Sequence, residues 1–429
     1  MKAATMQLPQ TPPLASTKVP APPPAHTLSR QLVFLMAVSV GLAVACIYYS
    51  QPMLGLFVAN GIGSPQEIGW IPTLTQLGYA GGLLFLAPLG DRYNRKTIIL
   101  VKGSMLVVCL LGFAASTGLP VMLLTSLFIG ACATMAQDIV PAAASLAPEN
   151  QRGKIVGTVM TGLLLGILLS RVISGIVADA VGWRYVFLLA AFSIMACLLA
   201  IARGLPSFTP TTELSYAKLM KSLFSLLGNY PALRAAALAQ GLISAGFSAF
   251  WSTLAVMLHA APFHLSSSAA GAFGLAGAAG ALAAPFAGKF ADKLGAPHVV
   301  RFGTMITSGF FLLMTLGSQL DPKLALIVLV IGTVGFDLGV QVSLIGHQTI
   351  VYSLDASARS RLNAVLLSSM FIGMSAGSIA GAMLLASWGW AAVTLFGTFC
   401  GCAAYLVRYV HAKKHRTRSP VTSPKIPSV

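Results

Sequence analysis

The chain has 429 residues, of which 56% are hydrophobic and 9% charged, with a formal net charge of +17. Soluble domains carry about 25% charged residues, so this composition excludes a soluble protein and predicts an all-α integral membrane protein. The Lys and Arg residues lie in loops and tails between apolar runs and form no basic face, so we expect no nucleic-acid partner.

Residues 1–30 are rich in proline and lack apolar periodicity, which predicts a disordered cytoplasmic tail. Twelve apolar runs of membrane-spanning length follow. They predict twelve transmembrane helices in two pseudo-symmetric six-helix bundles, at 31–205 and 232–411. The runs lie at 32–58, 67–90, 97–117, 119–147, 154–180, 184–203, 233–258, 267–290, 298–317, 324–353, 362–386 and 390–410.

The polar connector 206–231 divides the two halves. Within it Tyr216, Leu219, Leu223 and Leu227 recur at helical spacing, which predicts an amphipathic helix lying on the cytoplasmic leaflet. With both termini inside, the tails, including the basic tail 412–429, and the even-numbered loops hold 24 of the 27 Lys and Arg residues. This bias predicts a multi-pass protein of the plasma membrane, a bacterial inner membrane, with cytoplasmic termini.

The densest charge cluster is Gly90-Asp91-Arg92-Tyr93-Asn94-Arg95-Lys96, between the second and third runs. These charges cannot lie in hydrocarbon, so they predict a tight loop at the membrane surface. A related segment from Gly288 through Asp292 to Gly295 follows the eighth run. The pair resembles the loop signature of the major facilitator superfamily, with Ala87 and Asn94 in place of two glycines in the first copy.

The fifth run is similar to the antiporter motif of drug:proton antiporters in that superfamily. It carries Gly157, Gly166 and Gly175, which we expect to form one face for close helix packing. The Gly-Pro of the family motif is replaced here by Ser170-Arg171.

Ionisable residues well inside the runs are candidates for function, because a charge at the bilayer centre costs about 2.5–3.5 kcal/mol. Asp337 is predicted to be a protonatable carboxylate that couples transport to the proton gradient; the alternative is a structural ion pair. Arg171 is predicted to pair with it across the two halves, or else to bind an anionic substrate. Asp138 is a candidate gate residue, and His347 is expected to be a packed, neutral histidine.

The resemblance implies that the first, fourth, seventh and tenth spans line a central cavity. Candidate substrate-binding groups there are Gln51, Gln76, Gln240, Trp251 and Gln341, although each glutamine could instead form an interhelical hydrogen bond. The surface loops are expected to clasp the two halves on the cytoplasmic side. The candidate gating residues are Asp91, Arg92, Arg95, Lys96, Asp292 and Asp138.

We therefore expect a monomeric secondary active transporter that works by alternating access in the lipid bilayer. The favoured activity is proton-coupled efflux of a small organic compound; the alternative is uptake or facilitated transport of a sugar-like or carboxylate metabolite. A membrane-embedded enzyme or a transport-dead receptor is a further alternative. The sequence has no nucleotide-binding loop, metal-ligand cluster or nucleophile–base pair, so we expect neither an enzyme nor a cofactor.

Overall fold

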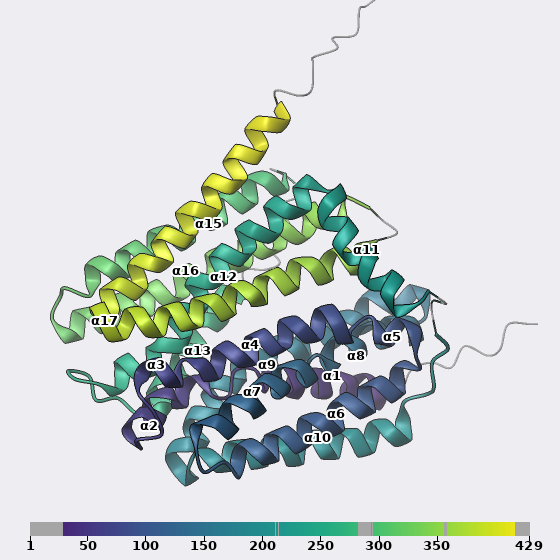
Figure 1. Cartoon of the computed structure of the whole chain (residues 1–429), viewed down its shortest axis with the longest axis horizontal. Helices are drawn as coiled ribbons and strands as arrows, with labels where there is room; N and C mark the ends of the chain where they lie inside the picture. The colour runs from purple at the N-terminus through teal and green to yellow at the C-terminus, as the bar shows by residue number, and fades with distance from the viewer. Residues whose placement is uncertain are drawn as a thin grey trace, which may run out of the picture.

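A computed structural model describes residues 29–210, 212, 214–281, 293, 295–355 and 358–416. Within these ranges every regular element is a helix (Figure 1). The two predicted tails fall almost wholly outside the described residues, and so does Asp292.

The first part of the chain forms ten α-helices, a short π-helix and two 3-10 helices, Gln51–Met53 and Glu149–Gln151. The α-helices and the π-helix are α1 (Arg30–Ala45), α2 (Leu54–Ala59), α3 (Pro65–Ile68), α4 (Trp70–Gly81), the π-helix Gly82–Leu86, α5 (Leu89–Arg92), α6 (Arg95–Ala114), α7 (Leu119–Ala133), α8 (Met135–Leu146), α9 (Arg152–Val181) and α10 (Trp183–Gly204). The second part contains α11 (Tyr216–Asn229), α12 (Pro231–His259), α13 (Ser267–Ala281), α15 (Ala296–Gly317), α16 (Pro322–Tyr352) and α17 (Arg359–Arg416).

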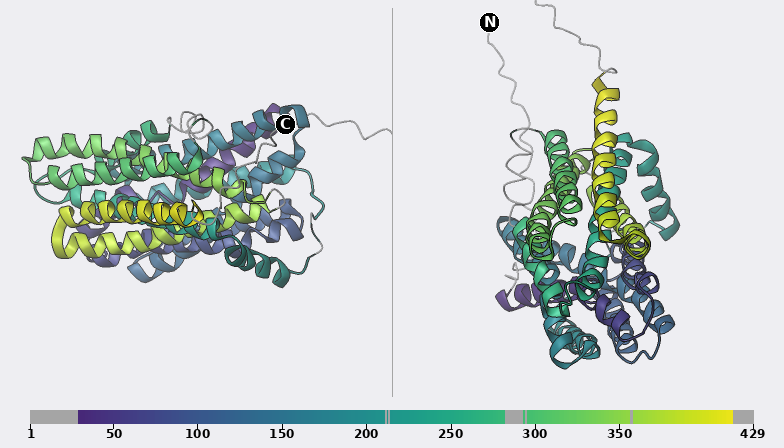
Figure 2. Two further views of the ribbon diagram at one scale, coloured as in Figure 1. Left: turned by 90° about the horizontal axis from the view of Figure 1, so that it is seen from above. Right: turned by 90° about the vertical axis from the view of Figure 1, so that its left-hand side faces the viewer.

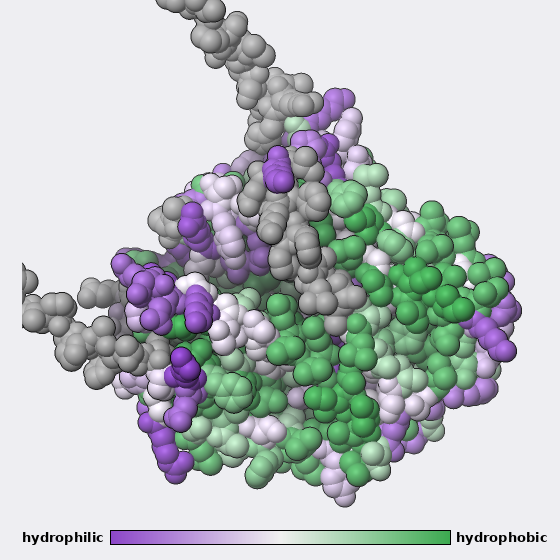
Figure 3. Space-filling model, turned by 180° about the vertical axis from the view of Figure 1, so that it is seen from behind, coloured by the Kyte–Doolittle hydropathy of each residue, from purple (hydrophilic) through white to green (hydrophobic). Residues whose placement is uncertain are grey.

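Eight helical stretches of the described chain are long and apolar enough to cross a membrane. The last, α17, reverses at Gly389, whose φ of 76° and ψ of −170° only glycine adopts readily, so it runs as two helices. The surface agrees with a membrane position, because an apolar belt covers the middle of the molecule and hydrophilic residues gather at its two ends (Figure 3).

The two ends differ in charge. We call the end that carries α5 and α11 the basic end, and the end with the turns at Gly61, Gly182 and Gly389 the opposite end.

The helices of the first part and those from α12 onward form two groups that lie side by side along the long axis (Figures 1 and 2). We refer to these groups as the first half and the second half.

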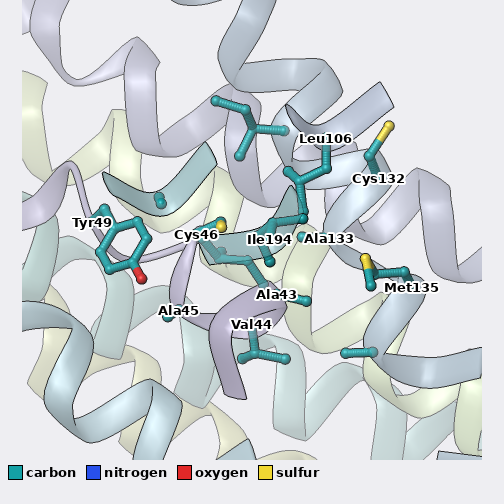
Figure 4. Packing of buried hydrophobic residues seen from close by; sticks show 14 of the residues in the cluster. Ala43, Val44, Ala45, Cys46, Tyr49, Leu106, Cys132, Ala133, Met135 and Ile194 are labelled. Carbon is teal, nitrogen blue, oxygen red and sulfur yellow. The ribbon is translucent and has the colours of Figure 1, made fainter. Parts of the chain in front are cut away.

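The core of the first half is built around α1, which packs against α8, α9 and α10. Close to the C-terminal end of α1, small side chains such as Ala43 and Cys46 face Leu106, Ala133 and Ile194 of the surrounding helices (Figure 4). Small residues at such contacts allow the helix backbones to approach closely.

The predicted amphipathic helix in the connector corresponds to α11, but its apolar face packs on protein. Leu223 and Leu226 belong to an apolar cluster with Leu233 of α12 and Leu362 of α17. On the other side, the hydroxyl of Tyr216 donates a hydrogen bond of 2.9 Å to the carbonyl of Phe85. Leucines of this face are therefore covered by the second half, and the position of the helix at the cytoplasmic leaflet stays a prediction.

The three glycines of α9 do not share one face. A spacing of nine residues is about two and a half helical turns, so successive glycines point to opposite sides. A side chain at Gly166 would meet the backbone of Gly41 in α1, whereas one at Gly175 would meet the backbone of Ser267 in α13. Gly157 is exposed near the basic end with nothing within 4 Å of an added Cβ.

This difference predicts opposite effects of alanine at two glycines of the same helix. Gly166→Ala should destabilise the protein by about 1–3 kcal/mol, because its methyl group has no room against Gly41. Gly157→Ala is the matched control and should be neutral or stabilising by up to about 1 kcal/mol, since alanine favours helix. Thermal unfolding in detergent measures both, and equal melting temperatures for the two variants would contradict the packing described.

Candidate functional site

Arg171 lies in α9 at the boundary between the two halves and is only 3% exposed. Its Nε donates a hydrogen bond of 2.8 Å to Oε1 of Gln51. Its guanidinium stacks over the rings of Tyr48, at 4.6 Å from the centroid, and Trp251, at 4.2 Å. A desolvated cation–π contact contributes about 2 kcal/mol, so two of them offset the roughly 2.5–3.5 kcal/mol cost of a charge at membrane depth.

Tyr48 and Gln51 come from an irregular stretch that interrupts the first predicted span between α1 and α2. Pro52 has no backbone N–H to donate to a helical hydrogen bond. The backbone turns here are instead closed by 3-10-type hydrogen bonds to the residue three positions earlier, such as the 3.1 Å bond from the N–H of Gln51 to the carbonyl of Tyr48. Interrupted helices in membrane proteins occur where the backbone lines a site or a cavity. The break therefore presents both side chains to Arg171.

Asp337 approaches the same place from α16 of the second half and is 7% exposed. Its Oδ1 has no hydrogen-bond partner, and its Oδ2 lies against Gly277 of α13. Within the described chain, the ion pairs closer than 4.0 Å are Arg95–Asp91 and Lys102–Asp138. Arg171 and Asp337 are thus not in direct contact in this conformation, and their pairing stays a prediction for another state.

Three glycines of α13 bring these charges close to one another. A side chain at Gly271 would collide with the backbone of Arg171, one at Gly274 would make a tight contact with the Arg171 side chain, and one at Gly277 would collide with Asp337. Because the three lie at three-residue intervals, they form one bare stripe against α9 and α16. Arg171 and Asp337 consequently lie against the same side of α13, about one turn apart. Sequence reasoning did not single out this stripe, although the regular glycine spacing was visible.

The glutamines divide between two places. Gln51 and Gln76 lie where the halves meet, since Oε1 of Gln76 accepts a 3.0 Å hydrogen bond from Ser248 of α12. Gln240 instead contacts Nδ1 of His347 at 2.9 Å, inside the second half. Gln341 is partly buried on α16, one turn beyond Asp337.

The loop at the basic end contacts its own half and the connector. Asp91 accepts a 2.8 Å hydrogen bond from Arg95, and its carbonyl accepts one of 3.2 Å from the N–H of Thr212. Arg92 lies over the ring of Tyr93, and Lys96 is in the first turn of α6. A cavity of about 80 Å³ separates this loop from the start of α17. The expected clasp between the halves thus remains a prediction for the other state.

Asp138 forms an ion pair that sequence reasoning missed. Its Oδ2 accepts a 2.7 Å hydrogen bond from Lys102 of α6, and its Oδ1 lies against Gly90 of the loop. Lys102 was counted among the loop bases, but it is 4% exposed inside the helix. Arg408 in α17, 5% exposed, was miscounted in the same way.

A further carboxylate not predicted from the sequence joins the halves at the opposite end. Asp179 of α9 accepts hydrogen bonds from the backbone N–H groups of Ser267, at 3.2 Å, and Ser268, at 2.7 Å. These are the first residues of α13, whose unpaired N–H groups and positive dipole end favour an anion. Together with the Gly175 contact, this joins α9 to α13 at the opposite end, whereas Gly157 on the same face of α9 has nothing within 4 Å of an added Cβ near the basic end.

The match to known families agrees with this architecture. A model of the Major Facilitator Superfamily matches residues 33–354. The chain belongs to this superfamily. The transporter is 42% identical over 389 residues to the transporter YgaY of Escherichia coli O157:H7, across 90% of this chain and 96% of that one.

Two other proteins extend the comparison. The multidrug resistance protein MdtG of Serratia proteamaculans is 26% identical over 392 residues, covering 87% of the transporter and 92% of MdtG. The crystal structure of a mutant of the nucleoside transporter NupG has a TM-score of 0.74 at 12% identity, covering 88% and 99% of the chains. The similarity to NupG shows a shared fold. The Major Facilitator Superfamily consists of transporters and not of enzymes.

The buried Lys102–Asp138 pair predicts strong non-additivity in stability. Lys102→Met or Asp138→Leu alone leaves an uncompensated buried charge and should cost about 3–5 kcal/mol, whereas the double variant should be nearly neutral. Asp91→Asn, which opens a pair whose carboxylate side chain is 43% exposed, should cost no more than about 1 kcal/mol. Thermal unfolding of the four variants measures the coupling, and additive losses at positions 102 and 138 would refute it.

Proposed function

We propose that this transporter exports a small organic compound in exchange for protons, and that its substrate binds between Arg171 and Asp337. The observation that carries the proposal is the placement of two opposite, deeply buried charges, one from each half, with an unpartnered carboxylate oxygen on Asp337. A buried carboxylate without a partner is a natural site for a proton. Because the charges come from different halves, their separation changes when the halves move.

The contacts between the halves support alternating access. The opposite end is joined by Asp179 and Gly175, while the basic end has the exposed Gly157 and the small cavity beside Asp91. We assign the basic end to the cytoplasm because most Lys and Arg residues flank the helices there. In the proposed cycle the conformation described, joined at the opposite end, precedes the state that opens toward the cytoplasm, from which an exporter collects its substrate.

Proton exchange follows from competition for Asp337. The groups that face this carboxylate or lie near it are Gly277 of α13, Trp251 of α12, Arg171 of α9 and the ring of Tyr48, on which Arg171 stacks. In the state closed at the basic end, the ionised carboxylate would pair with Arg171; protonation would release Arg171 and favour the present conformation. A proton and a substrate that bind the same carboxylate alternately give antiport.

Asp337→Asn should uncouple transport from the proton gradient. In proteoliposomes, with a compound that a thermal-shift screen identifies as a ligand, the variant should lose pH-driven accumulation and keep substrate counterflow. The amide retains the shape of the side chain but takes up no proton. Glu67→Gln, at an exposed carboxylate near the opposite end, is the control and should keep both activities. Undiminished pH-driven accumulation in Asp337→Asn would remove this residue from coupling.

A further inference from the structure

The boundary between the halves gathers polar atoms without hydrogen-bond partners. They are Nε2 of Gln51, Nη2 of Arg171, Oδ1 of Asp337 and Nε1 of Trp251, whose indole N–H lies beside the Asp337 carboxylate without a well-aligned hydrogen bond. All four side chains are more than nine-tenths buried. An unpaired buried polar atom is costly, so a ligand that supplies the missing partners gains binding energy there.

The hydrogen-bond partners that are missing differ between the Arg171 side and the Asp337 side of this boundary. Gln51 and Arg171 offer N–H donors, and the guanidinium is a fork that suits a carboxylate. The same guanidinium already covers the faces of Tyr48 and Trp251, at 4.6 and 4.2 Å. A cationic ligand stacked on either ring would meet a like charge, so this side selects an anionic group.

The other side offers an acceptor. Oδ1 of Asp337 is unpartnered, and the bare backbone at Gly277 lies against the other carboxylate oxygen. An ammonium group satisfies this carboxylate, whereas a second anion is repelled by it. A ligand with one charge of each sign therefore compensates both protein charges, and a ligand with a single charge leaves one of them without a counter-charge.

An apolar wall adjoins these polar groups. Phe247 packs against the apolar clusters of both halves and is only partly buried. Its ring centroid lies 6.3 Å from that of Trp251 and 6.2 Å from that of Phe336. Aromatic walls of this kind take an apolar or aromatic ligand group.

We propose that the substrate is a small zwitterion with an apolar side chain, such as an apolar amino acid. Its carboxylate binds Arg171 and Gln51, its ammonium binds Asp337, and its side chain lies against Phe247. The inference rests on the proposed function only in placing the substrate between the halves; proton coupling is not needed for it.

The test measures the binding of a matched ligand series to the purified full-length transporter by calorimetry at neutral pH. The probes are phenylalanine, phenylalaninamide, which keeps only the positive charge, and N-acetylphenylalanine, which keeps only the negative charge. The wild-type protein should bind phenylalanine at least about tenfold more tightly than either derivative, the factor expected for one charge-assisted hydrogen bond. Glu67→Gln should show the same order.

Two variants should distinguish the two singly charged derivatives, and each variant should favour a different one. Asp337→Asn should bind N-acetylphenylalanine better than phenylalaninamide, and Arg171→Gln should show the reverse order, because each keeps one charged group. If a variant does not fold, the order of the three affinities in the wild-type protein alone decides whether the proposal stands. Equal affinities, a preference for the amide in the wild-type protein, or no binding of phenylalanine at millimolar concentration would overturn the proposal.

The outcome is distinguishable from failure of the proposed function. If the ligand preferences switch as stated but Asp337→Asn keeps full pH-driven accumulation, the zwitterion site stands and the proton role of Asp337 is wrong. If Asp337→Asn loses pH-driven transport of another ligand while phenylalanine does not bind, the coupling role stands and the zwitterion assignment is wrong.

Discussion

The burial of one guanidinium group is the constraint on which the rest of the site depends. Arg171 is buried within α9, a helix long and apolar enough to cross a membrane, where neither water nor hydrocarbon solvates its charge, so neighbouring elements must do so. The first span breaks at Pro52 and thereby supplies Tyr48 and Gln51, and α12 supplies Trp251. Gly274 of α13 leaves room for the arginine side chain.

The same constraint joins the two halves without locking them. Arg171 belongs to the first half, but one of its stacking partners, Trp251, belongs to the second. Cation–π contacts and packing on glycine tolerate a wider range of geometries than a bidentate ion pair does. Small movements of one half against the other therefore cost less free energy. The directional contacts between the halves include the hydrogen bonds that Asp179 accepts from the start of α13 at the opposite end, and the bonds that Ser248 and Ser375 donate to Gln76 and to the carbonyl of Thr73 in α4. That arrangement suits a rocking motion in which the centre stays closed while the ends open in turn.

The sequence predicted an all-helical membrane fold and the two buried charges, but not the partners of these charges. Hydropathy located the long apolar helices and identified Arg171 and Asp337, because isolated charges are conspicuous in apolar runs. It misjudged Lys102 and Arg408, since a base near the end of a run looks the same whether it faces water or the protein interior. The glycines at 157, 166 and 175 were expected on one face, although a nine-residue spacing turns them to opposite faces. The contact between Gln51 and Arg171 joins positions 120 residues apart and has no local signature.

In the proposed mechanism, protonation of Asp337 sets the separation of the halves at the opposite end. Spin labels at Val181, at the end of α9, and Leu320, between α15 and α16, report the opposite end by pulsed electron paramagnetic resonance in a variant without native cysteines. Lowering the pH should increase the population with the short distance, and raising it should increase a longer one. Asp337→Asn should keep the short distance at every pH, whereas Glu67→Gln should respond as the parent does. A pH response that persists unchanged in Asp337→Asn would contradict the account.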